Sequence, residues 1–186
     1  EDDILSPVPM YKGWPHGVGS YQLQDNISGG FFVDGRLHGK GISIDRRVFL
    51  LTDIYEITYN GIFDEGVFKN GIILEKHKTI DDREFKGNLL CRECAVGELK
   101  VIDSDKNIVK SIDKGTIVND HIEGEGVRVR HYNDSLTTRK TGFFVKGLLY
   151  GHGTKETTTI MPSGIKSEQI CSGFFWDDEF YKDVVI

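Results

Sequence analysis

The chain has 186 residues, the size of one domain, and contains 22 glycines but only 4 prolines. Its formal net charge of −6 provides no basic field that would attract nucleic acid. No apolar run of about 18 residues predicts a membrane span. These properties argue against a nucleic-acid-binding protein and against a transmembrane protein.

The first residues differ in character from the rest of the chain. Residues 1–10 are acidic and then interrupted by proline, so we expect an extended lead-in that either caps the first hairpin or is partly loose. Residues 11–29 form a half-repeat in which Gly17 and Gly19 have the spacing that closes the later units of Gly30, Gly115 and Gly142. A turn is expected at Gln24-Asp25-Asn26.

A glycine pattern then repeats along the chain. Gly30 is followed by glycines 5, 9 and 11 residues later, and Gly142 repeats these offsets. We call the first glycine of a unit position 0 and count the other positions from it. The units begin at Gly30, Gly61, Gly87, Gly115, Gly142 and Gly173. Such self-similarity predicts a repeat architecture in which each unit packs on its neighbours.

The pattern predicts that each unit forms an antiparallel hairpin. An apolar residue at position +2 shares one strand face with position 0. Positions +4 and +5 have turn chemistry, because glycine readily adopts positive φ. Examples are Asp34-Gly35, Glu65-Gly66 and Lys146-Gly147. One hairpin alone is marginal in water, so the hairpins must stack side by side.

The connections between units are unusually long. Successive position 0 glycines are 31, 26, 28, 27 and 31 residues apart. We interpret the extra residues as lengthened hairpins, since adding an even number of residues to each strand preserves its faces. The sheet should therefore be widest at 42–58 and 154–171. Turns are expected at the sequences Asp45-Arg46-Arg47, Asp103-Ser104-Asp105, Asn133-Asp134-Ser135 and Met161-Pro162-Ser163-Gly164.

These glycines and aromatics resemble the MORN repeat, whose consensus is close to Y-x-G-x-F/W-x-x-G-x-x-x-G-x-G, over about residues 11–186. The repeats start near 28, 59, 85, 113, 140 and 171. The aromatic of position −2 is present as Tyr59 and Phe85. Elsewhere that position holds Ser28, Asp113, Lys140 and Cys171. The resemblance implies an all-β fold: a single-layer, curved antiparallel β-hairpin solenoid of MORN-type repeats. The lead-in GWPHG is also similar to the MORN-like N-terminal region of SET-domain lysine methyltransferases.

Metal, cofactor and catalytic sites have little support in the sequence. Cys91 and Cys94 make a single CxxC, whereas structural zinc usually needs two such pairs. An odd number of cysteines, including Cys171, suggests a reducing compartment. His16 and His38 recur at one repeat position without a nucleophile, which indicates packing or turn geometry. Phosphate-binding glycine motifs are absent. We therefore expect no metal, no cofactor and no enzymatic activity.

The most informative positions are +1 and +2. Neighbouring residues of a strand point to opposite faces, and several units are apolar at both positions. The position +2 face is explained by hairpin stacking. The position +1 face needs either an internal cover, from the lead-in or the curl of the sheet, or a binding partner. The candidate partner-binding residues are Phe31, Phe32, Ile62, Phe63, Phe143, Phe144, Phe174 and Phe175.

The MORN resemblance implies a protein-binding scaffold or adaptor. We expect a non-catalytic, cytoplasmic protein that accepts a peptide or helix of a partner on its repeat surface, with association with the cytoskeleton or a membrane left open. A homodimer is left open too.

Two alternatives remain. One is a membrane-lipid tether that binds acidic lipid through Lys76-His77-Lys78 and through Arg128, Arg130, Arg139 and Lys140. The other is a regulatory module of a larger enzyme, such as a lysine methyltransferase or lipid kinase. The first residue, Glu1, allows this second alternative.

Overall fold

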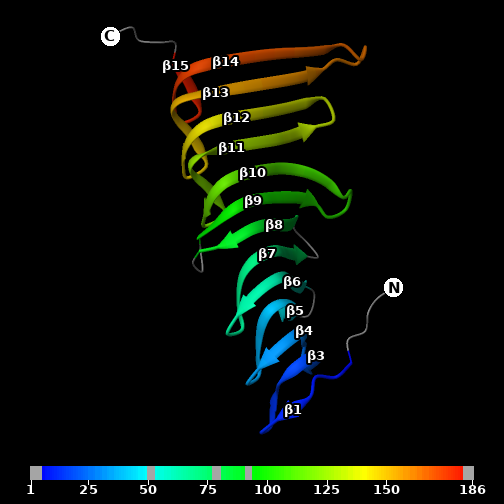
Figure 1. The fold of residues 1–186 in the computed structure, drawn as a ribbon. Helices are drawn as coiled ribbons and strands as arrows, with labels where there is room; N and C mark the ends of the chain where they lie inside the picture. Colours follow the sequence, from blue (N-terminus) through cyan, green and yellow to red (C-terminus); the bar gives the residue numbers. More distant parts are fainter. Residues whose placement is uncertain (1–5, 50–52, 77–80, 91–93, 182–186) are drawn as a thin grey trace. The chain divides into compact units, whose positions relative to one another are not determined.

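The computed structural model describes residues 6–49, 53–76, 81–90 and 94–181. These residues form strands and turns and contain no helix. Strands β3 to β15 follow one another in chain order in an open antiparallel sheet of 13 strands (Figure 1). The all-β class and the repeated hairpins predicted from the sequence are therefore confirmed.

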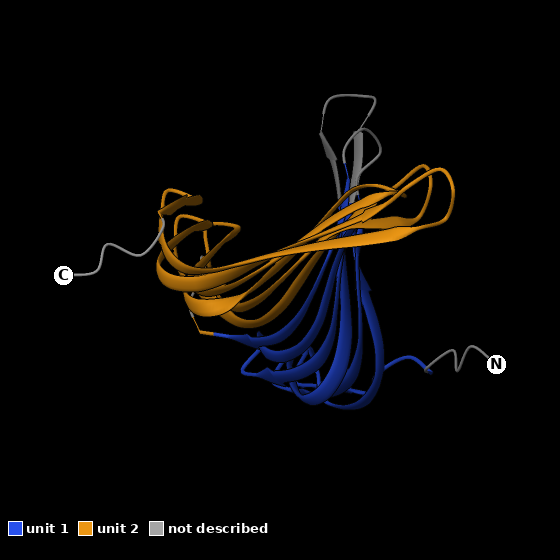
Figure 2. Ribbon diagram, turned by 90° about the horizontal axis from the view of Figure 1, so that it is seen from above, with its two compact units in different colours: residues 1–89 blue, residues 90–186 orange. Residues whose placement is uncertain are grey.

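The chain divides into two compact units, residues 1–89 and 90–186 (Figure 2). The first unit contains β1 (Met10–Tyr11), β2 (Trp14–Pro15), β3 (Gly17–Leu23), β4 (Asn26–Val33), β5 (Arg36–Phe49), β6 (Asp53–Asp64), β7 (Val67–Lys76) and β8 (Asp82–Leu89). The second contains β9 (Cys94–Asp103), β10 (Ile108–Val118), β11 (His121–Asn133), β12 (Leu136–Val145), β13 (Leu148–Ile160), β14 (Lys166–Trp176) and β15 (Glu179–Tyr181).

A row of glycines crosses each unit, one from each of the strands β3 to β8 and β9 to β14. In the first unit directly paired residues give the series Gly19, Gly30, Gly41, Gly61, Gly71 and Gly87. In the second unit they give the series Gly97, Gly115, Gly126, Gly142, Gly153 and Gly173. We call each series a glycine ladder. It divides every hairpin into a short arm, which ends in the position +4 and +5 turn, and a long arm on the other side.

The ladder leaves no room for side chains. A Cβ added at Gly61 would lie 2.0 Å from the carbonyl oxygen of Asn70, and one at Gly71 would lie 2.3 Å from that of Asn60. Beside the ladder the pairing register shifts, for example between Gly142 and Phe143. Such bulges bend strands, and the strands of each unit are strongly curved (Figure 2).

The predicted turns at positions +4 and +5 are confirmed. Asp34 and Gly35 have φ values of 47° and 82°, and Lys146 and Gly147 have values of 49° and 79°. Positive φ at both central residues defines the type I′ turn, whose twist matches that of the flanking strands.

The short arms of four units are hydrogen-bonded to the hairpin before them. The turn N–H at position +5 donates to the carbonyl oxygen at position +7 of the preceding unit. Four bonds of this kind are present among the described residues: Gly35 to Pro15 at 2.8 Å, Gly66 to Leu37 at 2.9 Å, Gly147 to Ile122 at 3.0 Å and Asp178 to Leu149 at 3.1 Å. The short arms are thus tied together beyond the strand pairing itself.

The core lies on the face of the short arms that turns toward the glycines. It consists mainly of residues at positions +2 and +7, such as Phe144 and Leu149, which are fully buried. Leu149 lies so close that a Cβ at Gly153 would be 3.1 Å from its Cδ1 atom. In the first unit Val8 of the lead-in joins Phe32 in this core. The hydrophobic stacking of hairpins therefore depends on the ladder.

The lead-in covers the edge strand β3, as expected from the sequence. Its backbone pairs with Ser20: the N–H of Val8 donates to the Ser20 carbonyl at 2.9 Å, and the N–H of Ser20 donates to the Ser6 carbonyl at 2.8 Å. The described part of the lead-in caps the first hairpin on its open side.

The long connections are lengthened hairpins, as predicted. The β5–β6 pairing continues to Phe49 and Asp53, and the β13–β14 pairing continues to Ile160 and Lys166. The expected turn at 45–47 is wrong, because these residues pair with 55–57 as strand. Arg46 and Glu56 form a 2.7 Å ion pair across the two strands, a cross-strand contact that supports continued pairing. The strands end at the other expected turns, at 24–25, 103–107, 133–135 and 161–164.

Because backbones approach closely at the glycine ladder, adding a single methyl group there should destabilise the fold strongly. Gly61→Ala should reduce the free energy of unfolding by about 3 kcal/mol or more, because the backbone of the neighbouring strand β7 at Asn70 and Gly71 must move. Gly39→Ala is the matched control: its added Cβ meets nothing within 4 Å, although its φ is +68°, so it should cost about 1–2 kcal/mol. Urea unfolding followed by circular dichroism measures both. Equal losses in the two variants would contradict the ladder as a steric requirement.

Candidate functional site

The eight predicted partner-binding residues separate into two sets. Those at position +2, Phe32, Phe63, Phe144 and Phe175, are 0–4% exposed. Those at position +1, Phe31, Ile62, Phe143 and Phe174, are 40–47% exposed. The first set forms the core, and only the second set offers apolar side chains to a partner. The lead-in residue Val8 packs with the core set.

The first unit has a small apolar surface at position +1. Val18 of the half-repeat lies directly opposite Phe31 and is exposed. Phe31 also pairs with His38, and Ile62 pairs with Lys40 on the strand beside it. Polar and cationic neighbours therefore interrupt the apolar surface of this unit.

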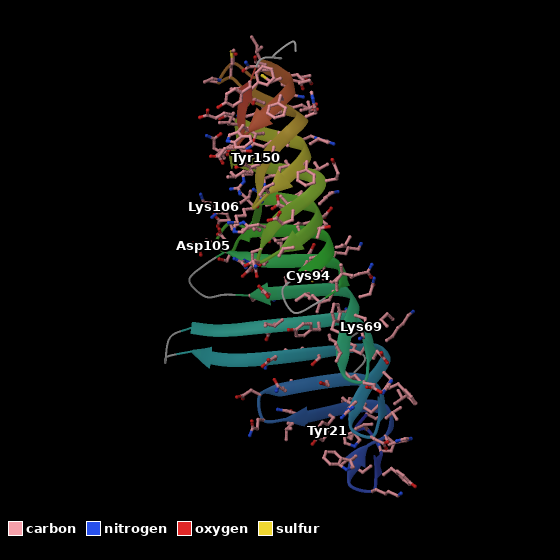
Figure 3. The ribbon with its side chains drawn as sticks, turned by 90° about the vertical axis from the view of Figure 1, so that its left-hand side faces the viewer. Tyr21, Lys69, Cys94, Asp105, Lys106 and Tyr150 are labelled. Carbon is pink, nitrogen blue, oxygen red and sulfur yellow. The ribbon has the colours of Figure 1, made fainter. Side chains whose placement is uncertain are left out.

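The second unit carries a larger, aromatic surface. Phe143 lies opposite Tyr150 in the β12–β13 pairing. The Tyr150 ring centroid is 5.3 Å from that of Trp176, in an edge-to-face arrangement. Phe174 pairs with Tyr181 of β15. We call these five residues, Phe143, Tyr150, Phe174, Trp176 and Tyr181, the aromatic patch; Tyr150 is labelled in Figure 3.

Three members of the aromatic patch, Tyr150, Trp176 and Tyr181, were not predicted from the sequence. Trp176 is at position +3, which alternation places on the same face as position +1, so this residue could have been found. Tyr150 follows a register shift of the pairing, so simple alternation did not reveal its neighbours. Tyr181 comes from the last, irregular unit.

Carboxylates border the aromatic patch. Glu125 lies opposite Phe143, and Glu179 lies opposite Trp176. The Tyr150 hydroxyl donates to Asp177 at 3.4 Å. Desolvation, followed by the negative charge of Asp177, raises the pKa of Tyr150 above its ordinary value. Tyr150 is therefore a neutral hydrogen-bond donor at physiological pH.

Two buried charges occupy position −2, where the MORN consensus has an aromatic. Asp113 accepts two hydrogen bonds from Arg128, at 2.7 and 2.6 Å, and Arg128 also donates to the carbonyl oxygen of Gly147. Lys140 donates to Asp178 at 2.5 Å. Both arrangements connect a long arm to the short-arm turn of a following unit.

The −2 position of the first repeat is hollow instead. Ser28 and Ser43 face each other across 3.2 Å and line a cavity of about 250 Å³, together with Tyr21 and Phe32. Tyr59 fills the same position of the next repeat, with its ring 5.5 Å from that of Phe68. The smaller serine accounts for the open space.

A second cavity, of about 430 Å³, lies at the long-arm turns of the second unit. Its lining includes Lys106, His131 and Asp134, and thus charges of both signs. Asp103 at its rim accepts from the Lys106 N–H at 3.0 Å, and this bond is the main cause that lowers the pKa of Asp103. Lys106 is labelled at this turn in Figure 3. The opposed charges give the cavity no preference for one kind of ion.

The cysteines and histidines that the structure describes form no recognisable site. Cys94 is disulfide-bonded and Cys171 is free; Cys91 lies outside the described residues. A disulfide does not agree with the expected reducing compartment, where thiols stay reduced. His16 lies 3.6 Å from Asp34. In the described parts of the chain no three His, Cys, Asp or Glu side chains are placed to hold a metal ion, and no helix could span a membrane.

Comparison with protein-family models and with curated proteins found no match. The MORN resemblance therefore stays a prediction from the sequence.

The contribution of the buried ion pair Asp113–Arg128 to stability can be tested directly. Asp113→Ala should lower the free energy of unfolding by about 3–5 kcal/mol, because it leaves the Arg128 charge buried without its partner. The double variant Asp113→Leu/Arg128→Leu should lose much less, since an apolar pair needs no compensating charge. Urea unfolding of the single and double variants gives both values. A double variant as unstable as Asp113→Ala would contradict this explanation.

Proposed function

We propose that the protein is a non-catalytic, protein-binding scaffold or adaptor. The observation that carries the proposal is the separation of the two apolar rows: position +2 is buried in the core, while position +1 is exposed in both units. Exposed apolar surfaces commonly mark binding sites. On this proposal the hairpins form a MORN-type solenoid that presents its position +1 residues to a peptide or helix.

The composition of the surface supports this proposal. Aromatic side chains dominate the binding energy of many protein interfaces, and they act best when grouped. The aromatic patch supplies five such rings from four neighbouring strands, β12 to β15. Their support is rigid, because the residue beneath the patch, Phe175, is fully buried.

Membrane-lipid tethering is less well supported. Arg128 and Lys140 were among the residues expected to bind acidic lipid, but both side chains are buried in ion pairs, with Asp113 and Asp178 respectively. Arg139 lies 4.0 Å from Glu156. Three of the four basic residues of this second cluster are thus near a carboxylate. In the first cluster, Lys76-His77-Lys78, His77 and Lys78 lie outside the described residues. No specific observation favours the alternative of a regulatory module of a larger enzyme.

The proposal predicts opposite effects of neighbouring substitutions. Phe143→Ser should change stability by no more than about 1 kcal/mol, because its side chain is already half exposed. Phe144→Ala should lose about 3–5 kcal/mol, because its ring is fully buried. Thermal unfolding followed by circular dichroism distinguishes them.

The folded variant Phe31→Ser/Phe143→Ser then tests binding. Affinity capture from a native extract should recover a partner with the wild type and lose it with this variant. Thr141→Ser, on the same strand as Phe143, is the control and should keep the partner. If the folded double variant retains every partner of the wild type, the position +1 surface is not the binding site.

A further inference from the structure

We propose that the aromatic patch binds a cationic, lysine- or arginine-bearing segment of its partner. This inference rests on the proposed function and specifies the chemistry of the partner at one part of the surface. It depends on two observations within the second unit: adjacent aromatic rings exposed on one sheet face, and carboxylates at both ends of their row.

The rings form a continuous row across three strands. Phe143 is opposite Tyr150, and Tyr150 contacts Trp176 edge to face. Phe143 and Trp176 are 47% and 58% exposed. An ammonium or guanidinium group within about 6 Å of such a ring is attracted by its electron-rich face. The aliphatic stem of lysine or arginine would cover the apolar surface between the rings.

The charges around the row select cations. Glu125 pairs with Phe143 at one end, and Glu179 pairs with Trp176 at the other. Asp177 lies beside Tyr150. Asp178 does not contribute, because Lys140 and the N–H of Leu149 already occupy its oxygens.

Among the residues that the structure describes, fewer positive groups lie near the patch. Lys146 is exposed at the short-arm turn, and its backbone N–H donates to Glu123. His152 stands edge to face with Phe174. The two glutamates that end the row therefore determine the sign of the field directly over the rings.

The first unit provides an internal comparison. Its position +1 residues Phe31 and Ile62 pair with His38 and Lys40. The carboxylate of Asp64, two residues after Ile62, lies 3.9 Å from Lys69, so cationic side chains accompany this apolar surface. A cationic segment should therefore bind only on the second unit. The same reasoning argues against acidic lipid as the occupant of the aromatic patch, since Glu125 and Glu179 would repel its headgroups.

The test uses hexalysine amide as the probe and the whole chain as the receptor. The protein has two tryptophans, Trp14 and Trp176, whose indole N–H signals can be followed by nuclear magnetic resonance and assigned with Trp176→Phe. Hexalysine should shift the Trp176 signal saturably at low salt and leave that of Trp14 unchanged. Hexaglutamate should shift neither signal. Added salt should weaken the binding.

Substitutions identify the groups responsible. Glu125→Gln/Glu179→Gln should weaken hexalysine binding about tenfold, since each carboxylate contributes a modest surface interaction. Glu156→Gln/Glu168→Gln on the long arms removes the same net charge and should change the affinity by no more than about twofold. Glutamine preserves shape at these sites, so loss of folding should not interfere.

Either of two results would overturn the inference: no saturable shift of Trp176 with hexalysine, or equal binding by the Glu125→Gln/Glu179→Gln variant. The proposed function would survive these results if Phe31→Ser/Phe143→Ser still lost its partner in the capture experiment. Retention of every partner by that folded variant would instead reject the proposed function.

Discussion

The close approach of backbones along the glycine ladder is the constraint on which the structure of each unit depends. A side chain at Gly61 or Gly71 would overlap the neighbouring strand. The absence of side chains allows each strand to bend where the register shifts. It also leaves space for core side chains such as Leu149, which lies against Gly142 and Gly153. Bending and core packing therefore share one cause.

The bend determines which apolar residues are buried. On the short arms, the face toward the ladder receives positions +2 and +7, and the turn N–H of one unit bonds the carbonyl of the unit before it. The opposite face has no covering layer in the described residues of either unit. Phe143 and Phe174 thus remain exposed because Phe144 and Phe175 are buried: strand alternation produces both outcomes.

The alternation of strand faces and the conformations of turn residues depend on neighbouring residues in the sequence. This explains which features could be predicted from the sequence. The hairpins, the positive-φ turns and the assignment of position +2 to the stacked face all follow from residue spacing. Phe32 and Phe144, which are buried at this position, were nevertheless also chosen as candidate binding residues. The turn expected at 45–47 was wrong because strand pairing across Arg46 and Glu56 continued through a turn-like sequence. Tyr150 was missed because its neighbours depend on a register shift, which residue spacing does not reveal. The pairing of Asp113 with Arg128 likewise depends on which strands meet.

The residues at position −2 give the two units different interiors. In the first unit this position holds Tyr59 and Phe85, besides Ser28 at its hollow, whereas in the second unit it holds the buried charges Asp113 and Lys140, besides Cys171. These charges connect the long arms to the turns near Gly147 and Asp178, so they help to hold the short arms that carry the aromatic patch. Burying them requires well-formed partners. The firm attachment of these short arms is what a surface needs if it is to present aromatic rings in fixed positions, because less conformational freedom is then lost on binding.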